Sequence, residues 1–116
     1  MAAERLFVYG SLQRGFRHHE LLAGARFVER ASTVPGHRLV VVDGYPALTA
    51  GRGAVVGELF EVDTPLLERL DEFEDCPTLY QRIRVELAGG AGAWAYVMTA
   101  AAVVGCPEVA GGRWRE

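Results

Sequence analysis

Glu74 is the residue whose type and position most clearly predict chemistry, because it lies within an apolar stripe. At an advance of about 100° per residue, a helix gathers four apolar side chains of this segment on one arc: Leu66, Leu67, Leu70 and Phe73. Glu74 falls among the leucines, whereas the other acids of the segment fall on the opposite side. A carboxylate beside leucines loses hydration, so its pKa rises and it can exchange protons near neutral pH. We therefore expect Glu74 to be a general base, unless the helix ends at Phe73 and releases the side chain to water.

Glu58 is a second acid among apolar neighbours and is therefore a rival base. It belongs to a strand expected over Ala54–Val62, in which alternate residues share one face. Buried charges usually persist only when they are paired. The alternative interpretation of Glu58 is a structural carboxylate that pairs with Arg82 or Arg84 on a neighbouring strand.

The turn Tyr9-Gly10-Ser11-Leu12 follows an apolar segment that has the pattern of a short central strand. Glycine allows the backbone to approach a ligand closely, and successive N–H groups in such a turn can form an anion-binding concavity. The turn could hold a carboxylate or an oxyanion, although the same sequence is also typical of an ordinary turn. Tyr80, at the start of a later strand, either packs on the core or directs its hydroxyl group to the same ligand.

The chain of 116 residues is long enough for one domain with a real core and too short for two. Its net charge of −3, without any cluster of basic residues, argues against nucleic acid or an anionic membrane as a partner. Met1 to Leu6 lacks the segments of a signal peptide, and no apolar run approaches the roughly 20 residues of a membrane span. We expect one cytoplasmic domain over residues 1–116, whose oligomeric state the sequence does not predict.

No group of residues has the spacing of metal ligands. His18 and His19 are adjacent and point in different directions, and His37 stands alone. Cys76 and Cys106 form no CxxC pair, so we interpret both as free thiols. The sequence therefore predicts neither a metal nor another cofactor.

Strands outnumber helices in the pattern of apolar residues. The expected strands are Leu6–Tyr9, Ala25–Val34, Arg38–Val42, Ala54–Val62, Tyr80–Ala88 and Ala93–Met98, and a turn at Asp43-Gly44 precedes Tyr45–Leu48. A first short helix is expected over His18–Ala23. A second begins with Thr64 as N-cap and Pro65 at the first helical position, and it ends at residues 76 and 77.

These elements do not alternate regularly, which favours an α+β domain over a doubly wound sheet. We expect a mixed, strongly curved sheet that forms a small barrel-like core, with the second helix packed beside the Tyr9 turn. The core should cover about residues 5–99. The Ala/Gly-rich tail over residues 100–116 has no clear period, which is typical of a mobile segment.

Four short motifs in this order resemble the γ-glutamylcyclotransferase-like family, and within it the γ-glutamylamine cyclotransferase branch, also called AIG2-like. The motifs are Phe7-Val8-Tyr9-Gly10-Ser11-Leu12, Gly44-Tyr45-Pro46, Val56-Gly57-Glu58 and Leu70-Asp71-Glu72-Phe73-Glu74-Asp75-Cys76-Pro77, the last with Tyr80-Gln81-Arg82 after it. The similarity runs from about Leu6 to Met98. Each motif is short, but four in the correct order are specific.

The resemblance implies a reaction of one substrate, in which the free α-amine of a γ-glutamyl group attacks its own side-chain amide carbonyl. The products are 5-oxoproline and a released amine. By position, Tyr9 to Leu12 match the substrate-binding loop of the family, Glu74 matches its catalytic glutamate, and Tyr80 is a further candidate for substrate contact. The chemistry needs a base for the attacking amine and an acid for the departing nitrogen, which one carboxyl group can supply in turn.

The chain departs from the usual family pattern at two positions in the expected site. Ser11 stands where the loop frequently has threonine, and His18 stands where asparagine is common. The chain is also short after Met98, and we expect the pocket around the leaving amine to be built from variable loops and termini. Two alternatives to a γ-glutamylamine cyclotransferase stay open: a non-catalytic module that binds γ-glutamyl or amino-acid ligands, and a cyclotransferase that removes γ-glutamyl groups from a secondary metabolite.

Overall fold

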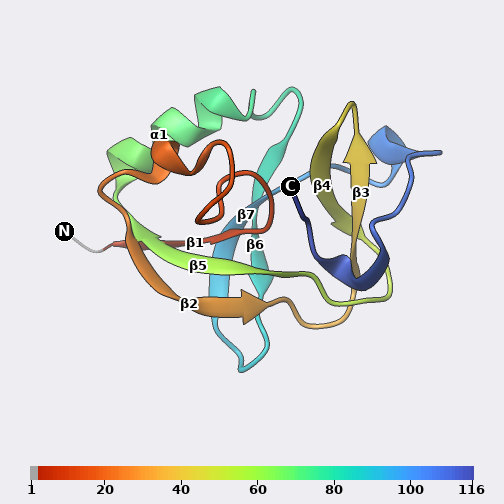
Figure 1. Cartoon of the computed structure of the whole chain (residues 1–116), viewed down its shortest axis with the longest axis horizontal. Helices are drawn as coiled ribbons and strands as arrows, with labels where there is room; N and C mark the ends of the chain where they lie inside the picture. Colours follow the sequence, from red (N-terminus) through yellow and green to blue (C-terminus); the bar gives the residue numbers. More distant parts are fainter. Residues whose placement is uncertain (1–2) are drawn as a thin grey trace.

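Seven strands form one mixed sheet that curves beside a single α-helix in the computed structural model, which describes residues 3–116 (Figure 1). In chain order the strands are β1 (Glu4–Val8), β2 (Arg26–Ser32), β3 (His37–Val42), β4 (Tyr45–Ala50), β5 (Val56–Val62), β6 (Gln81–Glu86) and β7 (Gly92–Val97). The helix α1 spans Thr64–Phe73, and three short 3₁₀ turns are η1 (His19–Leu22), η2 (Ala101–Val103) and η3 (Ala110–Gly112). The α+β prediction with a mixed, curved sheet is confirmed.

The sheet has the strand order β2-β5-β1-β7-β4-β3, and β6 pairs with β7 outside this path. Among the described strands the two parallel pairings both involve β7, one with β1 and one with β4, and the other pairings are antiparallel. The path ends at β2 and β3, and an isolated bridge between Thr33 and Leu87 connects the segment after β2 with the segment after β6.

Strand β1 lies at the centre of the sheet and is buried on both faces, as its continuous apolar sequence predicts. Leu6 and Val8 belong to the hydrophobic cluster that also contains the buried leucines of α1. Phe7 and Tyr9 belong to a second cluster on the opposite face. The strand therefore delivers the turn after Val8 to the interior of the molecule.

Helix α1 begins one residue earlier than the sequence pattern indicates. Asp63 is the N-cap, and its side chain accepts a hydrogen bond of 2.8 Å from the Leu66 N–H group. Thr64 is thus the first helical residue rather than the N-cap. The other expected helix, over His18–Ala23, is the four-residue 3₁₀ turn η1, since this segment is too short to close successive α-helical hydrogen bonds.

The residues after Met98 pack on the sheet beyond the expected core boundary near residue 99. Val103 is buried within the cluster that contains α1. The Val109 N–H group donates to the Leu39 carbonyl at 2.7 Å, and the Val41 N–H group donates to the Pro107 carbonyl at 2.9 Å. The tail thereby pairs backbone N–H and carbonyl groups at the outer edge of β3. The periodicity of the sequence does not predict this pairing. The mobility of the tail stays a prediction.

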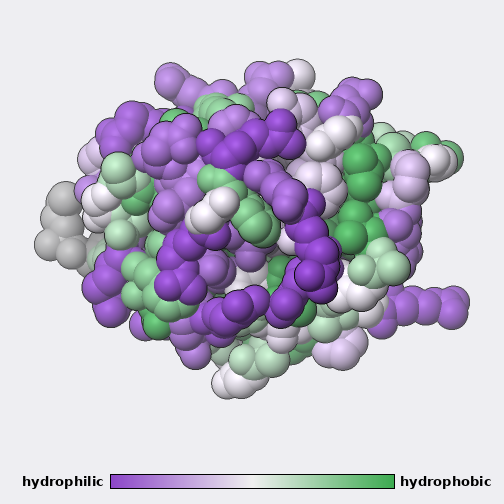
Figure 2. All heavy atoms as spheres, in the orientation of Figure 1, coloured by the Kyte–Doolittle hydropathy of each residue, from purple (hydrophilic) through white to green (hydrophobic). Residues whose placement is uncertain are grey.

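Hydrophilic residues cover most of the face seen in Figure 2, where hydrophobic residues form small separate patches. Within residues 3–116, no helix has the length and apolar character needed to cross a membrane. Met1 and Ala2, part of the segment interpreted as lacking a signal peptide, lie outside the described residues.

Candidate active site

A pocket of about 380 Å³ lies where the end of β1, the start of β4, the end of α1 and the end of β7 meet. Its floor consists of buried side chains, including Tyr96 and Met98. The structure brings every site residue predicted from the sequence to this one pocket: Tyr9, Gly10, Ser11, Leu12, Glu74 and Tyr80. That these residues act on a substrate stays a prediction, but their proximity satisfies the geometric condition for a joint site.

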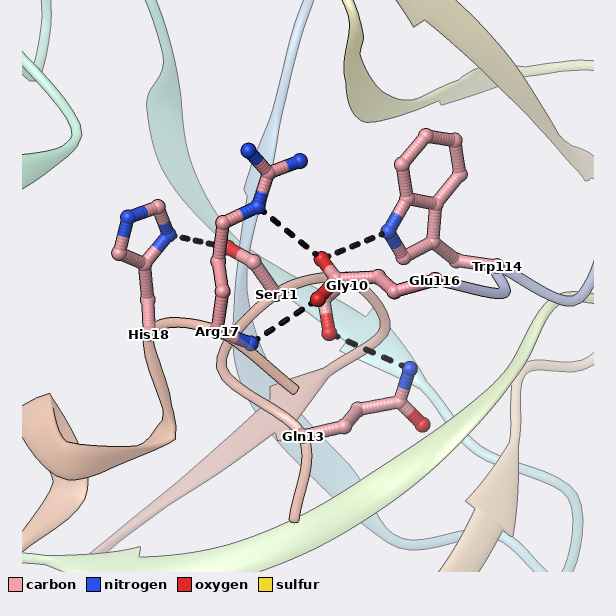
Figure 3. Close-up of polar contacts among 7 residues, drawn as sticks. All are labelled: Gly10, Ser11, Gln13, Arg17, His18, Trp114 and Glu116. Atoms are coloured by element: carbon pink, nitrogen blue, oxygen red, sulfur yellow. Dashed lines mark hydrogen bonds and ion pairs between the residues drawn. The ribbon is translucent and has the colours of Figure 1, made fainter. Parts of the chain in front are cut away.

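The backbone of the turn is held at its glycine by close packing. A Cβ atom on Gly10 would lie 2.6 Å from Cγ of Pro46, well inside van der Waals contact. The Gly10 carbonyl accepts hydrogen bonds from the N–H group of Gln13 at 3.1 Å and from its Nε2 at 3.3 Å (Figure 3). Gly10 is therefore required by the proximity of the β4 proline.

Ser11 is linked to His18, which also lines the pocket (Figure 3). The Ser11 Oγ and the His18 Nδ1 are 3.0 Å apart, and the His18 N–H group donates to the Ser11 carbonyl at 3.0 Å. The His18 ring in turn contacts the edge of Phe73, with 5.2 Å between ring centroids. The two positions that depart from the family pattern are thus bonded to each other.

The N–H groups of Ser11 and Leu12 face no hydrogen-bond acceptor within residues 3–116. Both residues line the pocket, and the side chain of Leu12 is buried. Buried or half-buried backbone donors are ordinarily paired, so two consecutive free donors at a pocket are suited to an anionic ligand.

Helix α1 ends at Phe73, earlier than the expected end at residues 76 and 77, but Glu74 is its C-cap residue and lines the pocket instead of being released to water. Its N–H group donates to the Leu70 carbonyl at 2.9 Å, so the last turn remains intact. Asp75 follows in the left-handed region with φ of 53°, and the Cys76 N–H group reaches back to the Asp71 carbonyl at 2.9 Å. This six-to-one bond is the mark of a Schellman motif. The motif fixes the backbone direction of Glu74 and turns its side chain to the pocket.

Burial raises the pKa of Glu74 to about 7, from an ordinary value of 4.5. The physical cause is the loss of hydration in an apolar pocket, as the position of Glu74 between leucines predicts. A carboxylate with this pKa can accept a proton at neutral pH and return it later in the same reaction.

The hydroxyl groups of two pocket tyrosines donate to backbone carbonyls. The Tyr9 hydroxyl donates to the Tyr96 carbonyl at 2.6 Å, and the Tyr80 hydroxyl donates to the Pro46 carbonyl at 2.9 Å. Burial raises the pKa of both tyrosines, and the nearby charge of Glu74 adds to the rise. Both hydroxyl protons therefore stay in place at neutral pH, and each oxygen keeps a free lone pair for a ligand donor.

Sequence reasoning missed Tyr96 and the network that holds it. The Tyr96 hydroxyl donates to the Asp71 carboxylate at 2.7 Å, and Arg82 binds the same carboxylate through Nε at 2.7 Å and Nη2 at 3.1 Å. Burial would raise the pKa of Asp71, but the hydrogen bonds from Arg82 and Tyr96 and the charge of Arg82 lower it below the ordinary value. The contacts of Asp71 with Arg82 and Tyr96 join α1, β6 and β7. The sequence shows these polar residues but not that they contact one another.

Glu58 is paired with Arg14, not with Arg82 or Arg84 as the sequence suggested. One carboxylate oxygen accepts the Arg14 N–H group at 2.9 Å, and the other accepts Arg14 Nε at 3.1 Å. Glu58 is buried and does not line the pocket. The prediction of a paired structural carboxylate holds with a different partner, because the loop after the Tyr9 turn folds over β5 and brings Arg14 to it.

The described part of the chain contains no group of three or more histidine, cysteine, aspartate or glutamate side chains placed to hold a metal ion. Both cysteines in this part are free thiols, as predicted. The pocket offers Glu74 as a carboxylate with a raised pKa, two unpaired backbone donors and an apolar floor. Such a set is suited to base-assisted attack on a carbonyl group, with the developing negative charge near the N–H groups.

The profile of the family described as "Gamma-glutamyl cyclotransferase, AIG2-like" matches residues 6–116. A "Gamma-glutamylaminecyclotransferase" of Mus musculus is 39% identical over 92 residues, which cover 71% of this chain and 62% of the mouse protein. The crystal structure of an AIG2-like protein from Mus musculus is 28% identical, with a TM-score of 0.87 over 99% of this chain and 90% of that chain.

A "Gamma-L-glutamyl-butirosin B gamma-glutamyl cyclotransferase" of Niallia circulans is 33% identical over 101 residues. The alignment covers 79% of this chain and 65% of that protein. The chain thus spans less than two thirds of the length of both the mouse and the Niallia relatives.

Proposed function

Because the chain belongs to the γ-glutamyl cyclotransferase, AIG2-like family, we propose that it converts γ-glutamyl amines into 5-oxoproline and a free amine. The observation that carries the proposal is the position of Glu74, with a pKa of about 7, on the same pocket as the Tyr9 turn. The mouse relative named for γ-glutamylamines supports the substrate class.

In the proposed reaction, Glu74 first removes a proton from the α-ammonium group of the glutamyl moiety. The neutral amine nitrogen then attacks the δ-carbonyl carbon, and the carbonyl oxygen takes up the electron pair as an oxyanion. The free N–H groups of Ser11 and Leu12 donate to an oxygen anion of the glutamyl moiety. Glu74 gives this proton to the leaving nitrogen and then accepts the second proton, which the ring nitrogen loses after the attack. The carbon–nitrogen bond of the amide breaks, and the carbonyl group re-forms within the five-membered ring. The released amine takes up the second proton and leaves Glu74 deprotonated for the next turnover.

The remaining pocket residues position the substrate rather than move protons. Attack within one molecule already benefits from proximity, so the pocket mainly needs to fold the substrate into a reactive shape and exclude water. The buried floor supplies the dry surroundings, and the tyrosine oxygens of Tyr9 and Tyr80 are available to accept hydrogen bonds from the α-ammonium group.

A second candidate function is removal of the γ-glutamyl group from a larger amine of secondary metabolism. The observation that favours it is the similarity to the Niallia protein, whose name specifies γ-L-glutamyl-butirosin B. The chemistry at Glu74 is the same in both cases, and only the size of the leaving amine differs.

The test is to incubate the purified protein with γ-glutamyl-ε-lysine isopeptide, and separately with a γ-glutamyl aminoglycoside, and to measure 5-oxoproline by mass spectrometry. We expect 5-oxoproline from at least one of these, and a loss of about 10²-fold or more for Glu74→Gln. Glu72→Gln is the matched control, since Glu72 is exposed and does not line the pocket. A ligand that raises the melting temperature but is recovered unchanged would instead indicate the non-catalytic binding module.

A further inference from the structure

The rim of the pocket differs in character from its floor. Four of the pocket residues are exposed: Asp43, Tyr45, Phe73 and Leu79. Three of them are apolar or aromatic, and one is an acid. In the proposed function the glutamyl moiety occupies the Tyr9 turn and Glu74, so the leaving amine extends from the half-buried Glu74 to this rim.

Negative charge predominates at the pocket. Its charged or titratable residues, apart from tyrosines, are Asp43, Glu74 and His18, and no arginine lines it within residues 3–116. The guanidinium group of Arg17 lies 5.2 Å from the centroid of the Tyr45 ring, but this arginine is already paired. Its Nε is 3.4 Å from the Glu116 carboxylate, which also accepts its N–H group at 2.9 Å (Figure 3). Arg17 is therefore the one cation near Tyr45, bound to Glu116 through Nε and exposed, whereas no arginine lines the pocket itself within residues 3–116.

Asp43 has a fixed position at this rim. It lies with Gly44 in the two-residue turn of the β3–β4 hairpin, closed by the pairing of Val42 with Tyr45. Both turn residues have positive φ, 51° for Asp43 and 83° for Gly44, as a type I′ turn requires. The hairpin tip lies beside the segment after α1, and residues from both line the pocket (Figure 1). The Asp43 carboxylate makes no hydrogen bond or ion pair with residues 3–116, so it is free for a ligand.

We propose that Asp43 is a specificity-determining residue, which favours leaving amines with a second positive charge on an alkyl chain over those with a carboxylate there. This inference rests on the proposed function. The methylene groups of such a chain would pack on Phe73 and Leu79, while its terminal ammonium group meets the Asp43 carboxylate. A carboxylate at the same place is repelled by Asp43.

Three amides with the same leaving chain length test the proposal: γ-glutamyl-putrescine, γ-glutamyl-butylamine and γ-glutamyl-4-aminobutyrate. Their leaving chains end in a cation, a neutral methyl group and an anion, respectively. We expect kcat/KM for 5-oxoproline formation to fall in that order, with a difference on the order of tenfold between cation and anion at low salt. Raising the salt concentration should narrow the difference, because the rim is exposed.

Asp43→Asn removes the charge and keeps a side chain that tolerates positive φ, so the hairpin should stay folded. We expect kcat/KM for the cationic amide, divided by kcat/KM for the anionic amide, to fall by about two- to fivefold in this variant. The matched control Glu72→Gln changes the net charge equally at an exposed residue outside the pocket and should leave the ratio unchanged.

The outcomes separate this inference from the proposed function. Equal rates for the three amides, or the same ratio for wild type and Asp43→Asn, would overturn the role of Asp43 while 5-oxoproline formation still supports the cyclotransferase. No 5-oxoproline from any of the three would overturn both. If Glu72→Gln lowers the preference for the cationic amide as much as Asp43→Asn does, the preference comes from the overall charge of the protein and not from the rim.

Discussion

Gly10 and Pro46 are packed so closely that the glycine has no room for a side chain: its Cβ would lie 2.6 Å from the Cγ of the proline ring. The proline ring is rigid and cannot rotate away. The same proline carbonyl accepts the Tyr80 hydroxyl at 2.9 Å. A displacement at this contact therefore moves both the turn and a second wall of the pocket.

Gly10→Ala should lower kcat/KM by about 10-fold to 10²-fold, because shifts on the order of 1 Å at a reacting site are costly. Its free energy of unfolding should fall by about 1–3 kcal/mol, as for other overpacked sites. Steady-state kinetics and urea unfolding measure the two effects. Gly53→Ala is the control, since the new Cβ there meets only the His37 carbonyl at an ordinary 3.5 Å. Wild-type turnover in Gly10→Ala would show that the contact does not position the turn.

The pH dependence of the reaction should report Glu74. Its pKa is raised to about 7, and the proposed base acts in the deprotonated form. We expect kcat/KM to rise tenfold per pH unit below the midpoint and to level off above about pH 7. Rates of 5-oxoproline formation between pH 5 and pH 9 measure this. A midpoint near 4.5 would mean that Glu74 is solvated in the working enzyme.

The stability of the chain should also depend on Glu74, with the opposite sign to activity. The pKa of Glu74 is about 7 in the folded chain and an ordinary 4.5 when unfolded, so the folded chain binds more protons between these values. The free energy of unfolding therefore falls as pH rises through this interval. Glu74→Gln lacks this titration. Its free energy of unfolding, relative to that of wild type, should therefore increase by about 2–3 kcal/mol between pH 5 and pH 8.

Urea unfolding of wild type and Glu74→Gln at pH 5, 6.5 and 8 measures this difference. Glu72→Gln serves again as the control for an exposed acid. If the difference in free energy of unfolding between wild type and Glu74→Gln is the same at all three pH values, burial of the carboxylate is contradicted.

Glu58→Gln should affect stability more than catalysis. The substitution weakens a buried ion pair with Arg14 but leaves the pocket lining unchanged. We expect the free energy of unfolding to fall by about 1–3 kcal/mol, with kcat within about threefold of wild type. Melting curves and rates should show that Glu58→Gln loses stability and keeps turnover, whereas Glu74→Gln loses turnover and stays folded. Loss of turnover in folded Glu58→Gln would restore Glu58 as a rival base.

Local patterns predicted the elements that carry the site. The apolar run before Tyr9 predicted a central strand, and β1 is buried on both faces. The helical arc that includes Glu74 predicted its burial, and Glu74 lies at the end of α1 on the pocket. These predictions succeeded because burial of one or both faces of an element determines the spacing of its apolar residues in the sequence.

Pairings between distant residues could not be predicted in the same way. Glu58 binds Arg14, 44 residues away, instead of an arginine on a neighbouring strand. Asp71 gathers Arg82 and Tyr96 from two strands that are adjacent only in space. Such contacts depend on strand order, which no periodicity encodes. The one-residue difference at the N-cap has a local cause, since Asp63 and Thr64 are both good capping residues.

The hydrogen bond from Tyr9 to Tyr96 joins residues that are 87 positions apart in the chain. During synthesis, the Tyr9 hydroxyl therefore cannot form this hydrogen bond until β7 has left the ribosome. Contacts of such long range make folding slow and cooperative, because a large loop must close before any of them forms. A fragment that ends before β7 would hold Glu74 and the Tyr9 turn and yet have no enclosed place for a ligand.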